Sequence, residues 1–403
     1  MTAAPAHSET RRATAVLAVT QVTGWGTTFY IPAILGRDIG ADLGLSVETV
    51  FAGVTVMLIT SGIVSPWLGR WMDRNGAAPV LVAGSILTAA ALGLLAVATG
   101  LWGYVAAWMA IGLATACSLA LPSFTALAQV AGDRARQAMI VLMLLTGGSS
   151  SIAWPATAWL ESAIGWRQTC LVFAAIHLLV CLPLHLFVLP RRRAHAEGGP
   201  PRPVSPPNIA PEKRRLALLM MLPAFACSGF VSWGLSLHLV DMLASIGMTP
   251  AFALALGSSV GVLQVSARIG EFAFGRYVTP GVSAAGASVL MVAAFLLLAW
   301  PPITTAQAIA FVVIYAFGSG LLGVTRATLP LWAFGSANYG TIAGRIAPVQ
   351  NIAFAAAPLV FAAVTEAFGI RAGLLMSLAI ATLAAVFMTV LAVVVVRSPA
   401  PRA

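Results

Sequence analysis

The strongest constraint on this chain is a series of long apolar runs, each almost free of charge. A run of about 20 apolar residues is long enough to cross the hydrocarbon core of a bilayer as a helix. Only 8% of the residues are charged, whereas a typical soluble domain has about 25%. The runs also lack the ten-residue alternation that is typical of outer-membrane barrels. The sequence therefore predicts an all-α membrane protein.

Twelve such runs define the expected transmembrane helices. Their expected bounds are 13–34, 49–68, 79–99, 102–130, 138–161, 168–189, 215–241, 250–274, 283–300, 304–333, 342–366 and 371–396. Residues 1–12 are short and polar, and the first run is long enough to span without a small-residue cleavage pattern after it. We therefore expect a retained first helix and not a signal peptide.

The basic residues between the runs indicate how the chain is oriented. With the N-terminus placed in the cytoplasm, sixteen Lys and Arg residues lie on that side, and only Arg37, Arg167 and Arg371 lie on the other. Because cytoplasmic loops carry the excess of Lys and Arg, both termini of this multi-pass chain are expected on the cytoplasmic face of the inner (plasma) membrane. The net charge of +10 then reflects topology and anionic lipid, and no nucleic-acid partner is expected.

A short charged turn separates the second and third runs. It reads Gly69-Arg70-Trp71-Met72-Asp73-Arg74-Asn75-Gly76. This spacing resembles the loop between helices 2 and 3 of the major facilitator superfamily of secondary transporters, with Ala77-Ala78 where that family usually has basic residues. The resemblance implies twelve transmembrane helices in two pseudo-symmetric six-helix bundles.

The turn also suggests a gate. Gly69 and Gly76 suit a tight turn with close helix approach, and Asp73 can accept hydrogen bonds from a helix N-terminus. By the family resemblance the partner is helix 11, which begins near 339–341. We expect Gly69, Asp73, Arg74 and Gly76 to form a cytoplasmic gate; the alternative is a merely solvated loop.

Two further features support a duplicated chain. Residues 190–214 are rich in Pro and Arg and are expected to be a cytoplasmic linker between bundles at 1–189 and 215–403. Three features recur at offsets of 202 to 208 residues: Trp25 with Trp233, Arg74 with Arg276, and the Pro155 to Arg167 segment with the Pro358 to Arg371 segment. Parallel six-helix halves are the pattern of the superfamily. Gly275 stands where the first half has Asp73, so the second copy of the turn is degenerate.

Polar and aromatic side chains within the spans are the candidates for substrate binding, because such residues usually face the bundle interior or a water-filled path. Helices 1 and 7 line the pore in the superfamily, and helices 8 and 10 carry further polar residues on shared faces. The candidates are Gln21, Trp25, Tyr30, Trp233, His238, Gln264, Arg268, Tyr315 and Arg326. Helix packing is the alternative role for these residues, and Arg268 could instead pair with Glu271.

The charges within the spans favour an anionic substrate. No Asp or Glu lies mid-span in the first half, where carriers of cationic drugs usually place a carboxylate. A buried guanidinium binds carboxylate or phosphate through paired hydrogen bonds. An Arg on helix 8 also resembles the arrangement in monocarboxylate and oxalate/formate carriers. The expected function is transport of a small organic anion, driven by a proton or solute gradient; efflux of a drug or toxic compound is the alternative.

Motifs of enzymatic chemistry are missing from the sequence. It has no phosphate-binding GxxxxGK[ST], no Gly-x-Ser-x-Gly elbow and no cluster of metal ligands. The four cysteines lie in apolar spans without ligand spacing and are expected to be packing residues. We therefore expect no enzyme activity, cofactor or metal. The expected partners are a small-molecule substrate, a proton or counter-solute and the lipid bilayer.

Overall fold

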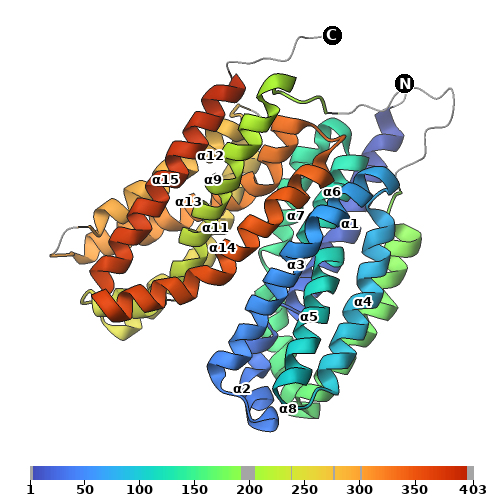
Figure 1. Ribbon diagram of the computed structural model, residues 1–403, viewed down its shortest axis with the longest axis horizontal. Coiled ribbons are helices and arrows are strands. Elements are labelled where there is room, and N and C mark those ends of the chain that lie inside the picture. The colour runs from blue at the N-terminus through green and yellow to red at the C-terminus, as the bar shows by residue number, and fades with distance from the viewer. Residues whose placement is uncertain (1–2, 192–204, 237, 276, 300–301, 397–403) are drawn as a thin grey trace. The chain divides into compact units, whose positions relative to one another are not determined.

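The computed structural model describes residues 3–191, 205–236, 238–275, 277–299 and 302–396, and every regular element among them is a helix (Figure 1). Arg276 lies outside these residues, and so does most of the expected linker at 190–214. The chain divides into two compact units, one of Met1–Ser205 with Gly335–Pro348 and the other of Pro206–Phe334 with Val349–Ala403. These units differ from the expected halves mainly because residues 335–348 pack with the first unit.

The first unit contains the helices before the linker and the beginning of α14. In chain order these are α1 (Ala3–Thr27), α2 (Ile31–Leu43), α3 (Val47–Asn75), α4 (Ala78–Ala96), α5 (Gly100–Ser118), α6 (Ala120–Val130), η1 (Gly132–Arg134), α7 (Ala135–Thr146), α8 (Ser149–Ile176), η2 (His177–Cys181) and η3 (Leu184–Val188). Its core lies among α2, α3, α4, α5 and α8. The fully buried Trp108 of α5 contacts α3 at Gly53, where a Cβ would lie 2.6 Å from the indole ring.

The second unit contains the remaining helices and the rest of α14. They are η4 (Pro211–Lys213), α9 (Arg214–Ser236), α10 (Leu239–Ser245), α11 (Pro250–Phe274), α12 (Pro280–Leu297), α13 (Thr305–Phe334), α14 (Tyr339–Phe368) and α15 (Ile370–Val396). Its core centres on Phe295 of α12 and on Phe311 and Tyr315 of α13. The rings of Phe311 and Tyr315 stack with their centroids 5.7 Å apart. This aromatic layer holds α13 against its neighbours.

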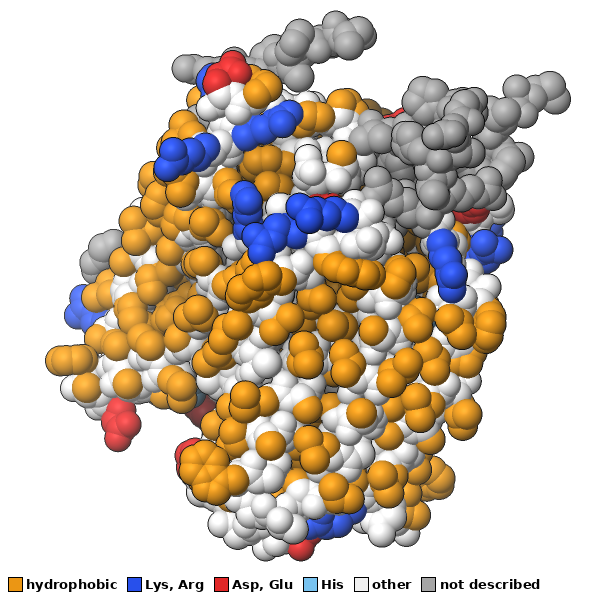
Figure 2. Space-filling model, turned by 45° about the vertical axis from the view of Figure 1, so that its right-hand side comes forward, with side chains coloured by type: hydrophobic (Ala, Val, Ile, Leu, Met, Phe, Trp, Pro, Cys, Tyr) orange, Lys and Arg blue, Asp and Glu red, His pale blue; other side chains and the backbone are white. Residues whose placement is uncertain are grey.

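The helices have the length and composition of membrane spans. Among the described residues ten candidate spans are long and apolar enough to cross a bilayer, and one of them, Gly132–Val188, contains two of the expected runs. Helix α1 covers most of the first expected run. In Figure 2 hydrophobic side chains dominate the visible face. The expectation of an all-α membrane fold is confirmed, and the mean hydropathy of +0.94 has its explanation in this lipid-compatible surface.

One element of the duplication is visible in the backbone. Gly165 interrupts α8 with φ of 78°, and Gly369 separates α14 from α15 with φ of 82°. The two glycines lie 204 residues apart and precede Arg167 and Arg371 by two residues each. Left-handed backbone is readily adopted only by glycine, so both halves end one helix and begin the next with the same device.

Two buried histidines join helices within the first unit. His177 Nε2 lies 2.8 Å from Thr27 Oγ1, and His185 lies 2.8 Å from Ser85 Oγ through Nδ1 and 3.0 Å from Thr20 Oγ1 through Nε2. Buried polar groups need such partners. Both histidines therefore act as packing residues between the π-helical segments η2 and η3 and helices α1 and α4.

Candidate functional site

The carboxylate of Asp73 caps the first turn of α14. The backbone N–H of Gly340 donates to Oδ1 at 3.0 Å, and that of Thr341 donates to Oδ2 at 2.6 Å. The first N–H groups of a helix have no partner within the helix, and a negative charge is favourable at this end of the helix dipole. Each carboxylate oxygen thus satisfies one N–H, which is the contact expected for Asp73 from the sequence.

The backbones of α3 and α14 touch beside this cap. A Cβ on Gly69 would lie 2.1 Å from the carbonyl oxygen of Gly340, and one on Gly344 would lie 2.5 Å from that of Ser65. Ser65 and Gly69 on α3, and Gly340 and Gly344 on α14, are each four residues apart, as in the small-residue pairs that let membrane helices approach closely. Only glycine fits at positions 69, 340 and 344, where an added Cβ would overlap atoms of the facing helix.

The end of α3 is held by Gln129, a side chain that no sequence pattern singled out. Gln129 of α6 donates from Nε2 to the carbonyl of Met72 at 2.9 Å and accepts from the N–H of Ala77 at 2.9 Å. The expectation of a turn from Gly69 is wrong, because α3 continues to Asn75 and Gly76 ends it with φ of 92°. Arg74 is exposed in the last turn of α3, where a positive charge is favourable. Asp73 therefore lies in the last helical turns of α3, and Gln129 holds the backbone on both sides of it.

Replacing Asp73 by asparagine should weaken the start of α14. The amide keeps one acceptor oxygen but turns an NH₂ group toward the second N–H and removes the charge. Losing a cap costs about 1 kcal/mol, which corresponds to a roughly fivefold rise in the population of molecules whose first turn of α14 is open. Hydrogen–deuterium exchange of the Gly340 and Thr341 amides measures this, with the amides of α5 as the control. Unchanged exchange at α14 together with unchanged α5 would contradict the capping role.

In the second unit, Arg326 forms the outer layer of an aromatic stack. Its guanidinium lies 4.9 Å from the ring centre of Phe354, and the ring of Trp233 is parallel to that of Phe354 to within 8° at a centroid distance of 4.6 Å. Arg326 is half-buried, and its Nε atom is buried with no hydrogen-bond partner among the described residues. Cation–π contact stabilises the guanidinium without using its N–H donors. Those donors remain available to an acceptor.

A second cation and two polar side chains lie near this stack. Arg268 of α11 is close enough to Arg326 for their charges to interact. One turn earlier on α11, Gln264 donates from Nε2 to the hydroxyl of Ser319 on α13 at 3.0 Å. The backbones of the two helices meet at Gly320, where a Cβ would lie 2.8 Å from the Gln264 carbonyl oxygen. The second unit thus brings together Trp233, Gln264, Arg268 and Arg326 of the expected site residues.

Two of the expected second-unit residues serve packing. Tyr315 is 1% exposed and donates from its hydroxyl to the carbonyl of Ser232 at 2.8 Å. His238 does not extend α9 but begins α10, where its Nε2 donates to the carbonyl of Pro358 at 3.3 Å and its ring stacks on Phe361. Both side chains fix α9 and α10 to α13 and α14.

The expected residues of the first unit also divide into packing and accessible groups. Gln21 is 2% exposed and donates from Nε2 to the Ser118 carbonyl at 2.7 Å and to the Ser123 hydroxyl at 2.8 Å. Both Trp25 and Tyr30 meet the edge of Phe29 at 5.5 Å and are only partly buried. Gln21 is therefore committed to helix packing, whereas Trp25 and Tyr30 keep exposed ring surface.

Several residues of these clusters were missed from the sequence. Gly340 lies in the helix start that was expected at 339–341, and Gly344 could have been found from its four-residue spacing from Gly340. Gln129 and Phe354 carry no such signal, because their roles depend on which helix packs against them. Sequence periodicity assigns a residue to a face but does not say what that face contacts.

Comparison with known proteins places these features in a wider context. The model of the Major Facilitator Superfamily matches residues 16–358. A chloramphenicol resistance protein of Streptomyces lividans is 29% identical over 365 residues, which cover 85% of this chain and 86% of that protein.

Two solved structures share the fold across nearly their whole length. The human organic anion transporter MFSD10 (TETRAN) has a TM-score of 0.73 at 16% identity and matches 94% of this chain and 99% of its own. The transporter FucP in its outward conformation has a TM-score of 0.72 at 16% identity and matches 94% of this chain and 98% of its own. At these identities the structures establish a common helical fold and nothing about the substrate.

Proposed function

The chain belongs to the major facilitator superfamily, and from this premise we propose that it carries a small organic anion across the membrane by alternating access. A proton or solute gradient supplies the energy in this proposal. The observation that carries it is the guanidinium of Arg326, which lies within a candidate span with a buried, unused Nε donor.

The chemistry of this group selects for an anion. Arginine stays protonated in proteins, and its planar fork matches the two oxygens of a carboxylate. Placing the guanidinium on Phe354 fixes its plane, so that less side-chain freedom is lost when the anion binds. Arg268 adds a second positive charge to the same cluster. Repulsion between the two cations would be relieved by a bound anion.

The aromatic layer suggests a substrate with a flat apolar part. The partly buried Trp233 continues the stack beyond Phe354, and ring pairs of this kind contribute about 0.5–1.5 kcal/mol beyond their buried area. An aromatic carboxylate combines a carboxylate that Arg326 could bind with a flat apolar ring of the kind that packs beside aromatic side chains. We therefore take benzoate as the first test compound.

Asp73 and Gly69 supply the proposed gate on the cytoplasmic side. When the cap on Gly340 and Thr341 breaks, the first turn of α14 loses two hydrogen bonds and the helices lose their backbone contact. Contacts that form in only one of two conformations shift the equilibrium toward that conformation by the free energy that they contribute. Placement of the gate and both termini in the cytoplasm follows from the Lys and Arg distribution.

Drug efflux is the second candidate, and the relative from Streptomyces lividans favours it. That protein is named for chloramphenicol resistance, and the similarity covers most of both chains. The stacked Trp233 and Phe354 could hold an aromatic drug as well as an aromatic acid. The two candidates differ in whether the arginines are needed for recognition.

Transport in proteoliposomes distinguishes the two candidates. The purified protein is reconstituted, a proton gradient is imposed in either direction, and movement of radiolabelled benzoate and radiolabelled chloramphenicol is followed. Gradient-dependent benzoate movement that excess unlabelled benzoate suppresses would support the anion proposal. Chloramphenicol movement without benzoate movement would instead establish the second candidate and refute the first.

A further inference from the structure

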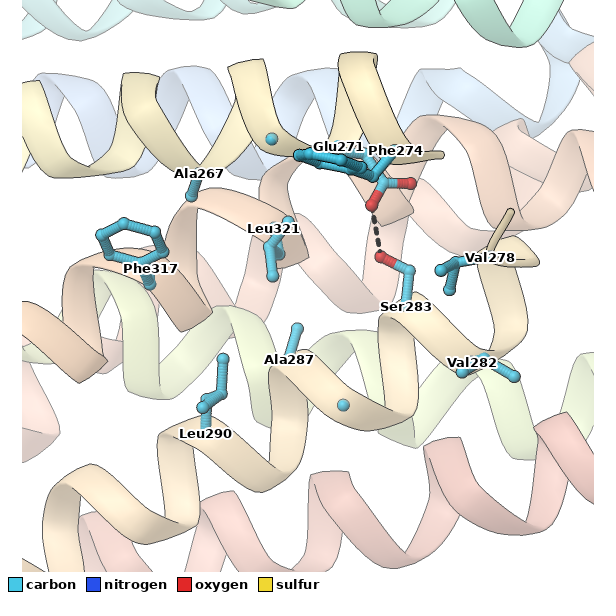
Figure 3. Close-up of a pocket in the computed structure, with 12 residues that line it drawn as sticks. Ala267, Glu271, Phe274, Val278, Val282, Ser283, Ala287, Leu290, Phe317 and Leu321 are labelled. Carbon is cyan, nitrogen blue, oxygen red and sulfur yellow. Dashed lines mark hydrogen bonds between the residues drawn. The ribbon is translucent and has the colours of Figure 1, made fainter. Parts of the chain in front are cut away.

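A cavity of about 510 Å³ lies among α11, α12 and α13 of the second unit (Figure 3). Its wall is apolar except for Glu271 of α11 and Ser283 of α12. Its volume is in the range of small-molecule sites. None of the residues expected from the sequence to bind substrate lines it.

The polar end of this cavity is a buried carboxylate. Glu271 is only 7% exposed, and the hydroxyl of Ser283 donates to its Oε2 at 2.7 Å. Ser283 belongs to the first turn of α12, which begins at Pro280, so the positive end of that helix dipole also favours a negative charge here. An ionised carboxylate accepts up to about four hydrogen bonds. The site is thus built to hold a negative charge and to accept donors.

The rest of the cavity is an apolar trough that leads away from this carboxylate. Glu271 lies three residues before the end of α11, about 4.5 Å from the helix end. From Ser283 to Leu290 the trough follows α12 for about 10 Å, and Figure 3 places Leu290 and Phe317 at the end remote from Glu271. An acidic group near the helix end with an apolar trough leading inward has the layout of a lipid in a bilayer.

The rim of the trough indicates that its occupant comes from the hydrocarbon phase. Phe274 is 66% exposed and Val282 is 52% exposed, and both line the cavity. Exposed side chains of this kind on a membrane span face lipid tails. Gly270 and Gly286 leave space in the wall, since no heavy atom lies within 4 Å of a Cβ built at either position.

We propose that this trough is a binding site for a bilayer lipid with a primary ammonium headgroup, of which phosphatidylethanolamine is the type. The ammonium donates to Glu271, and an acyl chain lies along the trough toward Leu290 and Phe317. Charge complementarity selects the ammonium, and its N–H donors distinguish it from the quaternary ammonium of phosphatidylcholine, which has none. The proposal uses none of the side chains assigned to the proposed anion site.

Native mass spectrometry of protein released from nanodiscs tests the proposal. The nanodiscs contain equal amounts of phosphatidylethanolamine and phosphatidylcholine, and the lipids retained by the protein are counted. The wild type should retain the ethanolamine lipid in preference to the choline lipid. Glu271→Gln should lower that preference by about tenfold, as expected for loss of a charge-assisted hydrogen bond.

A second variant separates the trough from the charge. Gly286→Leu fills the trough, keeps Glu271 and Ser283, and should also abolish retention of the ethanolamine lipid. The matched controls are Gly261→Leu, which adds the same side chain to open space on α11 outside the cavity, and Glu366→Gln, which removes an exposed carboxylate. Both should behave as the wild type.

Three results would overturn the assignment. The first is equal retention of the two lipids by the wild type. The second is a preference for the ethanolamine lipid that is undiminished in Glu271→Gln. The third is binding of tetraphenylphosphonium that depends on Glu271 and displaces the lipid. That result would make the occupant a lipophilic cation. Circular dichroism of each variant confirms that it is folded before its lipids are counted.

Discussion

Gly69→Ala is expected to open the contact between α3 and α14 and to raise hydrogen exchange at Gly340 and Thr341 by about a hundredfold, since overpacking costs up to about 3 kcal/mol. The added Cβ would lie 2.1 Å from the Gly340 carbonyl oxygen and 3.3 Å from the Gly344 Cα. All these neighbours are backbone atoms, so no side-chain rotation can relieve the overlap. The helices must move apart, which also lengthens the hydrogen bonds to Asp73.

Two further variants make this prediction specific. Gly340→Ala should have the same effect, because its Cβ would lie 2.8 Å from both Asp73 Oδ1 and the Gly69 carbonyl oxygen. Gly93→Ala adds the same methyl group to α4 of the same unit, where no atom lies within 4 Å, and should leave exchange at α14 unchanged. If Gly69→Ala exchanges like Gly93→Ala, the close approach does not hold the start of α14.

Arg326→Ala should reduce benzoate uptake into proteoliposomes by about a hundredfold, because a guanidinium–carboxylate pair loses roughly 3 kcal/mol of charge-assisted hydrogen bonding. The substitution leaves Phe354 stacked on Trp233 but removes the cation that lies 4.9 Å from the Phe354 ring centre. Arg326→Lys keeps the charge but not the planar fork. It should therefore transport benzoate at an intermediate rate.

The control for this prediction is Arg214→Ala, an exposed arginine at the start of α9. It removes the same side chain and the same charge from the second unit and should transport benzoate like the wild type. Each variant is reconstituted at equal protein density so that rates compare directly. Benzoate uptake by Arg326→Ala at the rate of Arg214→Ala would refute the role of Arg326, even if benzoate itself proved to be a substrate.

The contact between Asp73 and the start of α14 was accessible from the sequence because its chemistry is local. Asp73 is the one acid in the segment 69–76, and the start of its partner helix was expected near 339–341; α14 begins at Tyr339. Sequence alone does not separate substrate-binding residues from packing residues, because a polar residue in a span satisfies its hydrogen bonds wherever the nearest partner lies. Gln21 and Tyr315 have the residue types of a binding site, but the packing of neighbouring helices gives them structural partners.

The contacts of Glu271 also could not be predicted from helical spacing. Gln264, Arg268 and Glu271 lie at positions i, i+4 and i+7 of one helix, and this spacing places them on a shared face. In the folded chain Glu271 lines the lateral cavity with Ser283, whereas Gln264 bonds to Ser319 and neither it nor Arg268 lines that cavity. A helical face about 100° wide meets more than one neighbour, and only tertiary packing assigns each side chain to one of them.

The sequence by itself determined the helical membrane fold, the duplicated organisation and the charged segment from Gly69 to Gly76, because run length, repeated spacing and isolated charge are properties of the chain alone. The tertiary structure decided that Asp73 caps α14, that Arg326 lies on the Phe354 and Trp233 stack, and that a carboxylate lies in an apolar trough. Those features depend on contacts between residues far apart in the chain, whose partners follow from which helix surfaces fit together and not from local periodicity.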